Sequence, residues 1–111
     1  MAKKAQQNLL DFIPIRAFSF QQQENGLVTV TVPHTGFFDR LAQLLFHKPT
    51  QSLISLDKFG SFIWLQIDGQ RTVYEIGLLV QKQFGKAAEP LFERLSTFFI
   101  TLRQNRFITW K

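Results

Sequence analysis

The chain has 111 residues, of which 45% are hydrophobic and 19% are charged, a composition typical of one globular domain and unlike that of a disordered chain. It has no cysteine, which excludes a disulfide framework, thiolate catalysis and any cysteine-ligated metal or cluster. The formal net charge of +5 favours an anionic partner, although the lysines and arginines are scattered along the chain. No apolar run approaches the ~18 residues that span a bilayer, and the first residues lack the apolar centre of a signal peptide, so we expect a cytoplasmic protein without a membrane span.

Residues 1–14 are predicted to be an N-terminal extension, followed by a single domain over residues 15–111. The extension reads as a polar tail and a short helical turn at Asn8–Phe12, where Asn8 is the expected cap and Pro14 the expected stop.

The first two strands are expected at Ile15–Phe20 and Leu27–Val32, which are rich in β-branched and aromatic residues. Asn25-Gly26 lies between them, and this pair is a strong hairpin signal. In the second strand valines alternate with Thr29 and Thr31, the pattern of a strand with one buried face. The sequence therefore predicts a β-hairpin.

A helical insertion is expected at about residues 34–49, where apolar residues recur at helical spacing: Phe37, Phe38, Leu41, Leu44 and Leu45. A helix that docks on a membrane surface or on a partner usually carries more cations than this one does, so an insertion packed on the domain is the favoured interpretation. His34 and His47 flank it without a third ligand or a carboxylate cluster, so no metal site is predicted.

A third strand is predicted at Thr50–Leu56, with Ile54 and Leu56 on one face and Leu53 on the other. Asp57 is then expected to cap a helix that runs to about Ile67.

A second helix is predicted after a turn at Asp68-Gly69. Thr72 and Glu75 form a capping box at its start, and Gly85 suits the position just past its end. Its expected buried stripe is Val73, Ile76, Leu79, Val80 and Phe84.

A third helix is predicted to begin near Ala88–Pro90 and to stop at a left-handed Asn105. Phe107–Trp110 then reads as a short terminal strand or as an extended segment docked on the core. The order of elements predicts an α+β fold, and the compact solution is a winged helix-turn-helix-like domain with a three-stranded antiparallel sheet followed by three helices.

Residues from about 50 to 110 resemble the coenzyme PQQ synthesis protein D (PqqD) family, also described as the recognition element of ribosomal-peptide maturation systems. The resemblance is carried by the order and spacing of Leu56-Asp57, Gly60, Phe62, Trp64, the turn Asp68-Gly69-Gln70-Arg71-Thr72-Val73, Glu75-Ile76 and Phe107-Ile108.

The resemblance implies a non-catalytic peptide chaperone without a cofactor of its own. Members of the family bind a precursor or leader peptide as an added strand, between the edge of their third strand and their third helix, and present it to a radical S-adenosylmethionine (SAM) or other maturation enzyme. Transferred to this sequence, the edge is Gln51, Ser52, Leu53, Ile54, Ser55 and Leu56, and the groove wall is Leu91, Leu95, Phe98, Phe99 and Leu102. Arg94 and Arg103 are expected to pair with acidic residues of the peptide.

Two alternatives stay open at this stage, and catalysis is not among them. A winged helix with net positive charge is suited to DNA binding. However, the second helix offers few side chains that could contact base edges, and the negative charges of Glu89 and Glu93 at the start of the third helix would repel phosphate. Nucleic acid is therefore the less favoured partner. An exposed edge strand also permits a homodimer. The eight acidic residues are dispersed, and the expected roles of Asp57 and Glu75 are as caps, so no catalytic carboxylate pair is predicted.

Overall fold

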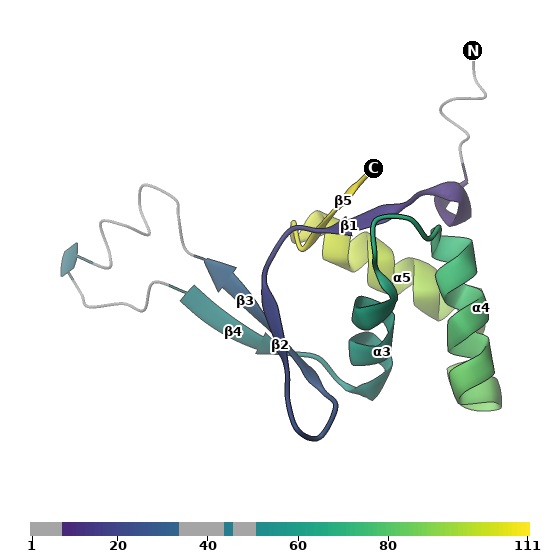
Figure 1. Ribbon diagram of the computed structural model, residues 1–111. Helices are drawn as coiled ribbons and strands as arrows, with labels where there is room; N and C mark the ends of the chain where they lie inside the picture. The colour runs from purple at the N-terminus through teal and green to yellow at the C-terminus, as the bar shows by residue number, and fades with distance from the viewer. Residues whose placement is uncertain (1–7, 34–43, 46–50) are drawn as a thin grey trace, which may run out of the picture.

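The computed structural model describes residues 8–33, 44–45 and 51–111 (Figure 1). Its first elements are the 3-10 helix η1 (Leu9–Asp11) and the strands β1 (Pro14–Arg16), β2 (Phe20–Gln22), β3 (Val28–Pro33) and β4 (Gln51–Ser55). They are followed by α3 (Lys58–Gln66), α4 (Val73–Phe84), the 3-10 helix η2 (Gly85–Ala88), α5 (Leu91–Gln104) and the strand β5 (Ile108–Trp110). This order confirms the predicted α+β class. The winged-helix topology stays a prediction.

A three-stranded antiparallel sheet has the strand order β2-β3-β4. The hairpin of β2 and β3 is confirmed, with Phe20 opposite Val30 and Gln22 opposite Val28. Gly26 has a φ of 87°, and the backbone N–H of Leu27 donates to the side-chain oxygen of Asn25 at 3.0 Å. Asn25 and Gly26 therefore shape the loop as expected, because glycine adopts this left-handed conformation without steric cost.

The prediction of one continuous strand at Ile15–Phe20 is wrong. The chain leaves β1 and turns before β2, and β1 pairs antiparallel with the C-terminal strand β5 in a separate two-stranded sheet. The backbone N–H of Ala17 donates to Phe107 O at 2.9 Å, and the rings of Phe18 and Phe107 meet edge to face at 5.4 Å. This pairing partner is more than 90 residues distant in the sequence, so local patterns could not indicate it.

The helix starts follow the predicted side-chain caps. The Asp57 carboxylate accepts the N–H of Gly60 at 2.7 Å at the start of α3. At α4, Thr72 Oγ1 accepts the N–H of Glu75 at 3.1 Å, and Glu75 Oε1 accepts the N–H of Thr72 at 2.8 Å. These contacts satisfy N–H groups that have no partner inside the helix, and such a cap is worth about 1 kcal/mol.

The end of the third helix differs from the prediction by one position. Asn105 has a φ of −93°, and Arg106 is the left-handed residue, with a φ of 65°. The Asn105 side chain instead donates to Thr101 O at 2.8 Å, so it caps the last turn of α5. The predicted terminal strand is confirmed as β5, and η2 separates α4 from α5.

The core lies between one face of the sheet and the helices, which stand together on that side in Figure 1. Val28 and Val30 of β3 are fully buried, and the core cluster to which they belong also contains residues of α3, α4 and α5. The largest fully buried side chains are those of Trp64 and Phe99. Within the described residues the indole N–H of Trp64 has no hydrogen-bond partner.

Two predicted segments lie wholly or partly outside the described residues. Of the predicted helical insertion at 34–49, the structure describes Leu44 and Leu45, both exposed. Of the predicted extension, it describes Asn8 onward, where Asn8 caps η1 through a 2.9 Å bond from Leu10 N, as expected. Phe12 O then accepts the N–H of Val73, which ties this segment to the start of α4.

Candidate functional site

The free edge of β4 is the first component of the candidate site. β4 pairs with β3 on one side, and no described residue pairs with it on the other. Leu56 N donates to Val28 O at 2.9 Å, so the backbone groups at position 56 point toward β3. Because successive residues of a strand point their backbone groups to opposite sides, those of Gln51, Leu53 and Ser55 face the open edge. This edge offers N–H donors and C=O acceptors to another strand.

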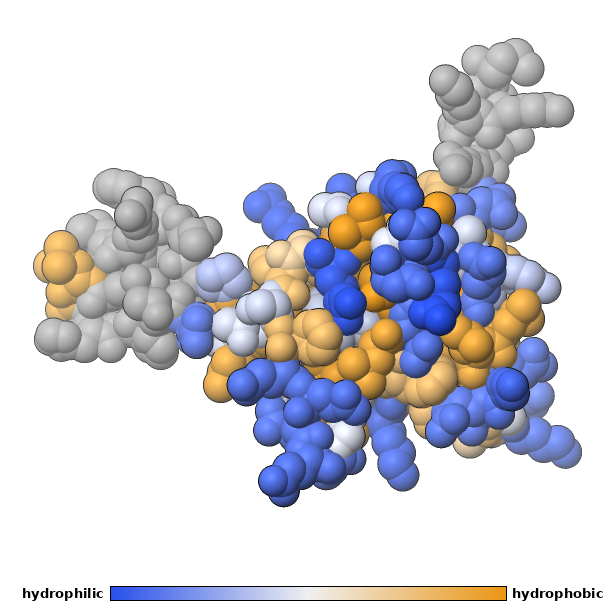
Figure 2. Space-filling view, viewed as in Figure 1, coloured by the Kyte–Doolittle hydropathy of each residue, from blue (hydrophilic) through white to orange (hydrophobic). Residues whose placement is uncertain are grey.

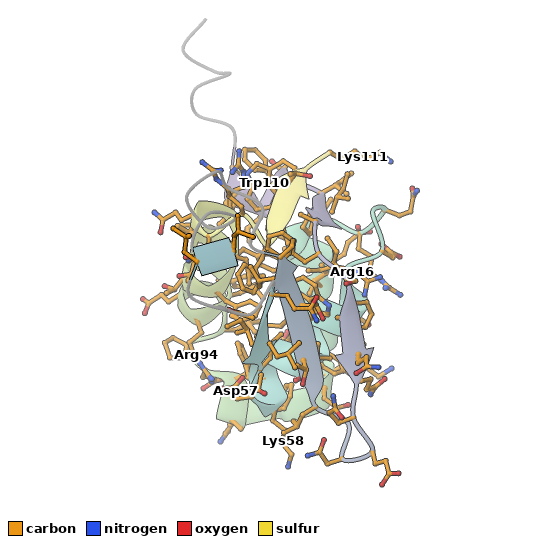
Figure 3. All side chains as sticks on the ribbon, turned by 90° about the vertical axis from the view of Figure 1, so that its left-hand side faces the viewer. Arg16, Asp57, Lys58, Arg94, Trp110 and Lys111 are labelled. Carbon is orange, nitrogen blue, oxygen red and sulfur yellow. The ribbon has the colours of Figure 1, made fainter. Side chains whose placement is uncertain are left out.

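A hollow of about 420 Å³ lies between β4 and α5. Figure 3 shows α5 beside the sheet next to β4, the strand that leads to Asp57. The strand side of the hollow is lined by Val32, Ser52, Ile54 and Leu56, and the helix side by Phe98, Thr101, Leu102, Asn105 and Phe107. Most of these side chains are apolar, with hydroxyl and amide groups among them. An apolar hollow beside an unpaired strand edge is suited to an extended peptide.

The two faces of β4 differ in what they meet. Ile54 lies opposite Val30 and lines the hollow, although its side chain is still 40% exposed. Leu53 lies opposite Thr31 on the outer face and is 64% exposed. The predicted alternation along this strand is therefore confirmed, and the Ile54 face is the one turned toward α5.

A second hollow, of about 460 Å³, follows the N-terminal half of α5. Its lining is Phe59, Pro90, Glu93, Arg94, Thr97, Phe98 and Thr101. Phe98 and Thr101 line both hollows, so the two adjoin along one side of α5. The second hollow lies beyond the end of β4, where α3 begins.

The two candidate arginines have different surroundings. Arg94 Nη1 donates to Ala87 O at 2.7 Å, and its guanidinium lies 4.1 Å from the centre of the Phe59 ring. These contacts hold Arg94 in the second hollow. Arg103 is exposed and lines neither hollow.

The predicted groove residues divide into four groups. Ser52, Ile54, Leu56, Phe98 and Leu102 come together around the first hollow. Leu95 and Phe99 are fully buried and belong to the core, while Leu91 is half-buried and lines neither hollow. Gln51, Leu53 and Ser55 do not line the hollow and offer backbone groups only.

Several lining residues escaped sequence reasoning: Val32, Phe59, Thr97, Thr101, Asn105 and Phe107. Phe98, Thr101 and Asn105 follow each other at steps of three and four residues, so they share one side of α5. The apolar stripe of this helix marks what is buried, and the lining of the hollow lies at the border of that stripe. The uncharged threonines at this border, Thr97 and Thr101, were the available signal in the sequence.

Another exposed apolar surface lies where α4 meets α5. The rings of Tyr74 and Phe92 stack with their planes 7° apart and their centres 6.0 Å apart, and Leu78 is nearby on α4 and 44% exposed. Gly77 permits this arrangement, because a Cβ there would lie 3.0 Å from Cε1 of Phe92. On the face seen in Figure 2, apolar and hydrophilic side chains are interspersed.

The turn between α3 and α4 is organised by one carboxylate. Asp68 accepts the backbone N–H groups of Arg71 at 2.8 Å and Gln70 at 2.9 Å, and its second oxygen pairs with the Arg71 guanidinium at 3.3 Å. The backbone N–H of Arg71, followed by that of Gln70, lowers the pKa of Asp68 below its ordinary value. The caps predicted at Asp57 and Glu75 are confirmed as well, so three carboxylates of this region have structural partners.

Among the described residues, no three histidine, aspartate or glutamate side chains come together in a way that could hold a metal ion. His34 and His47 lie outside the described part of the chain. None of the helices in that part has both the length and the apolar character to cross a membrane.

Comparison with known proteins identifies one family. The family model described as coenzyme PQQ synthesis protein D (PqqD) matches residues 43–108, a stretch that contains β4, all three α-helices and both hollows apart from Val32. No curated protein and no solved structure matches the chain. Because the match covers more than half of the sequence, the chain belongs to the coenzyme PQQ synthesis protein D (PqqD) family.

Proposed function

We propose that this protein is a non-catalytic peptide-binding module that captures a precursor or leader peptide by adding it as a strand to the free edge of β4. The observation that carries the proposal is the position of an apolar hollow directly beside a strand edge that no described strand pairs with. Membership of the PqqD family supports a role connected with PQQ biosynthesis and with peptide binding. The proposal assigns the edge to affinity and the hollow to selection of side chains.

The relative size of two effects indicates where the affinity arises. A backbone hydrogen bond contributes about 0.5–1.5 kcal/mol net, whereas ordering one residue of a flexible peptide costs about 1–2 kcal/mol. Edge pairing alone therefore does not hold the peptide. Burying one large aliphatic or aromatic side chain contributes about 1.5–3 kcal/mol, so side chains that enter the hollow supply the remainder. The bound segment is expected to be apolar at every second residue.

The bound peptide is then presented to a modifying enzyme, for which a radical SAM enzyme is our proposal from the family resemblance. The iron–sulfur cluster and cofactor of such a reaction belong to that enzyme. A peptide on β4 and α5 leaves the surface of Tyr74, Leu78 and Phe92 uncovered, since these residues line neither hollow. Both partners thus have room on one small domain.

Hydrogen exchange of individual amides tests strand addition directly. In the free protein the amides of Ile54 and Leu56 already bond toward β3, whereas those of Leu53 and Ser55 point to the other side of β4, where no described strand pairs with them. Addition of a binding peptide, selected from a random twelve-residue display library, should slow exchange at Leu53 and Ser55 and change little at Ile54. If bound peptide leaves Leu53 and Ser55 exchanging as in the free protein, the strand-addition proposal is wrong.

A single substitution provides the matched binding test. Leu53→Pro removes an N–H group from the free edge while the bonds to β3 are kept, since proline is tolerated where the N–H would face outward. Loss of one hydrogen bond that leaves the peptide carbonyl unpaired should weaken binding about tenfold. Leu53→Ala is the control, because it shortens the same outer-face side chain and keeps the N–H. Equal affinity of the two variants, measured by calorimetry with unchanged melting temperatures, would contradict the proposal.

A further inference from the structure

The second hollow extends the candidate site past the end of the strand edge. Phe98 and Thr101 belong to both hollows, while Phe59 and Pro90 line only the second. β4 ends at Ser55, and Phe59 lies in the first turn of α3, so a peptide that follows β4 in this direction leaves the strand edge and enters the second hollow. The residues that line this hollow meet the part of the peptide that no longer pairs with β4.

Arg94 is held in place within this hollow. Its guanidinium lies on the Phe59 ring at 4.1 Å and donates one hydrogen bond, from Nη1 to Ala87 O at 2.7 Å. A guanidinium has five N–H donors, and within the described residues Arg94 forms no ion pair with a carboxylate. Arg94 therefore presents a fixed cation with donors to spare, beside an apolar floor formed by Phe59 and Phe98.

We propose that Arg94 and the second hollow form a subsite for one acidic side chain of the captured peptide, located just outside the β4-paired segment at its Ser55 end. The inference rests on the proposed function, because it takes the peptide on β4 as given. A planar guanidinium binds a carboxylate in a two-pronged manner, and a side chain that is already immobilised loses little freedom on binding. The subsite adds charge selectivity to a groove that otherwise selects for apolar residues.

Two carboxylates near Arg94 bear on the strength of this subsite. Glu93 also lines the second hollow and is exposed. The Asp57 carboxylate lies at the same end of the molecule in Figure 3 but accepts the N–H of Gly60. Glu93 repels an incoming carboxylate, so its removal should strengthen the preference for an acidic peptide residue.

The experiment is a parallel selection from a random twelve-residue peptide display library. The whole protein is used as wild type, Arg94→Gln, Arg103→Gln and Glu93→Gln, with the melting temperature of each recorded. Arg103 is the matched control, since it is an arginine on the same helix that lines neither hollow. Wild type and Arg103→Gln should enrich Asp or Glu at one position on one side of an alternating apolar segment. Arg94→Gln should lose this enrichment, and Glu93→Gln should increase it.

Binding measurements with one selected peptide separate recognition from folding. Replacing its acidic residue by the matching amide should weaken binding to wild type by roughly three- to tenfold, and to Arg94→Gln hardly at all. If Arg94→Gln weakens both peptides equally, Arg94 acts only by supporting the fold and the inference is wrong. Selected peptides without an acidic position overturn the subsite alone, whereas a selection that yields no binding peptide overturns the proposed function as well.

Discussion

The turn between α3 and α4 and the groove between β4 and α5 differ in whether their backbone polar groups have hydrogen-bond partners. At the turn, the side chains of Asp68, Thr72 and Glu75 accept hydrogen bonds from backbone N–H groups, namely those of Gln70, Arg71, Glu75 and Thr72. At the groove, the backbone of Leu53 and Ser55 faces an open edge, and Leu53 and Ile54 are 64% and 40% exposed. The turn is complete within the chain, whereas the groove is the surface to which we assign the peptide in the proposed function. Under that proposal, stability and recognition are located in different elements.

The same contrast occurs between two adjacent residues of α5. Phe99 is fully buried, whereas Phe98 is half-buried and lines both hollows. Phe98 also meets Phe59 edge to face at 6.5 Å, so it connects the hollows with the start of α3. Helical geometry points neighbouring side chains about 100° apart, which places one ring in the core and the next at the site.

The largest expected effect comes from this pair. Phe99→Ala should lower the free energy of unfolding by about 3–5 kcal/mol, because it leaves a cavity in the core. Phe98→Ala should cost only about 1–2 kcal/mol and should weaken peptide binding instead. Urea unfolding and calorimetry with a selected peptide measure the two quantities. Equal destabilisation by both substitutions would remove the distinction between core and groove on this helix.

A smaller effect is expected at the capping box. Thr72→Ala removes the hydroxyl that accepts the N–H of Glu75 and should destabilise the protein by about 1 kcal/mol. Thr72→Ser is the matched control, since serine keeps the hydroxyl and should stay within a few tenths of a kcal/mol of wild type. Peptide affinity should be unchanged in both variants. A clear loss of affinity in Thr72→Ala would show that the turn and the groove are coupled.

The smallest effect concerns the acid stability of the turn. The pKa of Asp68 is lowered in the folded protein by the N–H groups of Arg71 and Gln70, so its contribution to stability is present above the unfolded pKa of about 3.9 and is lost as the pH falls through the lower folded value. Melting temperatures are measured from about pH 6 down to about pH 2. At the acidic end the melting temperature should fall less steeply for Asp68→Asn than for wild type, and the difference should be small because a single surface carboxylate causes it. Parallel curves for the two proteins would exclude this role.

Local sequence signals predicted most of the helical part correctly. Asp57, Thr72 with Glu75, and Gly85 mark the helix ends at the positions where the structure has them. Capping involves residues only two or three positions apart, so the signal and its effect lie in the same short stretch. The one-residue error at Asn105 and Arg106 arose because Asn105 bonds back to Thr101 O, and the left-handed conformation falls on the next residue.

The candidate site was predicted less completely. The strand and the helix that form it were identified, as were Ile54, Leu56, Phe98 and Leu102 among its lining residues. An apolar stripe does not distinguish a fully buried side chain from one at its border, so Leu95 and Phe99 were assigned to the groove although they fill the core. The contacts of Arg94 with Ala87 and Phe59 depend on how α5 packs against η2 and α3, which no local pattern encodes.

The sequence by itself determined the α+β order, the β2–β3 hairpin, the helix caps and the family, because each depends on residue types at short and regular spacing. Only the tertiary structure decided that β1 leaves the hairpin to pair with β5, that β4 is an edge within the described residues, and which side of α5 borders it. These features bring together segments far apart in the chain, so their energies come from long-range packing. The adjacency of an unpaired edge and an apolar hollow, on which the proposed function depends, is of this second kind.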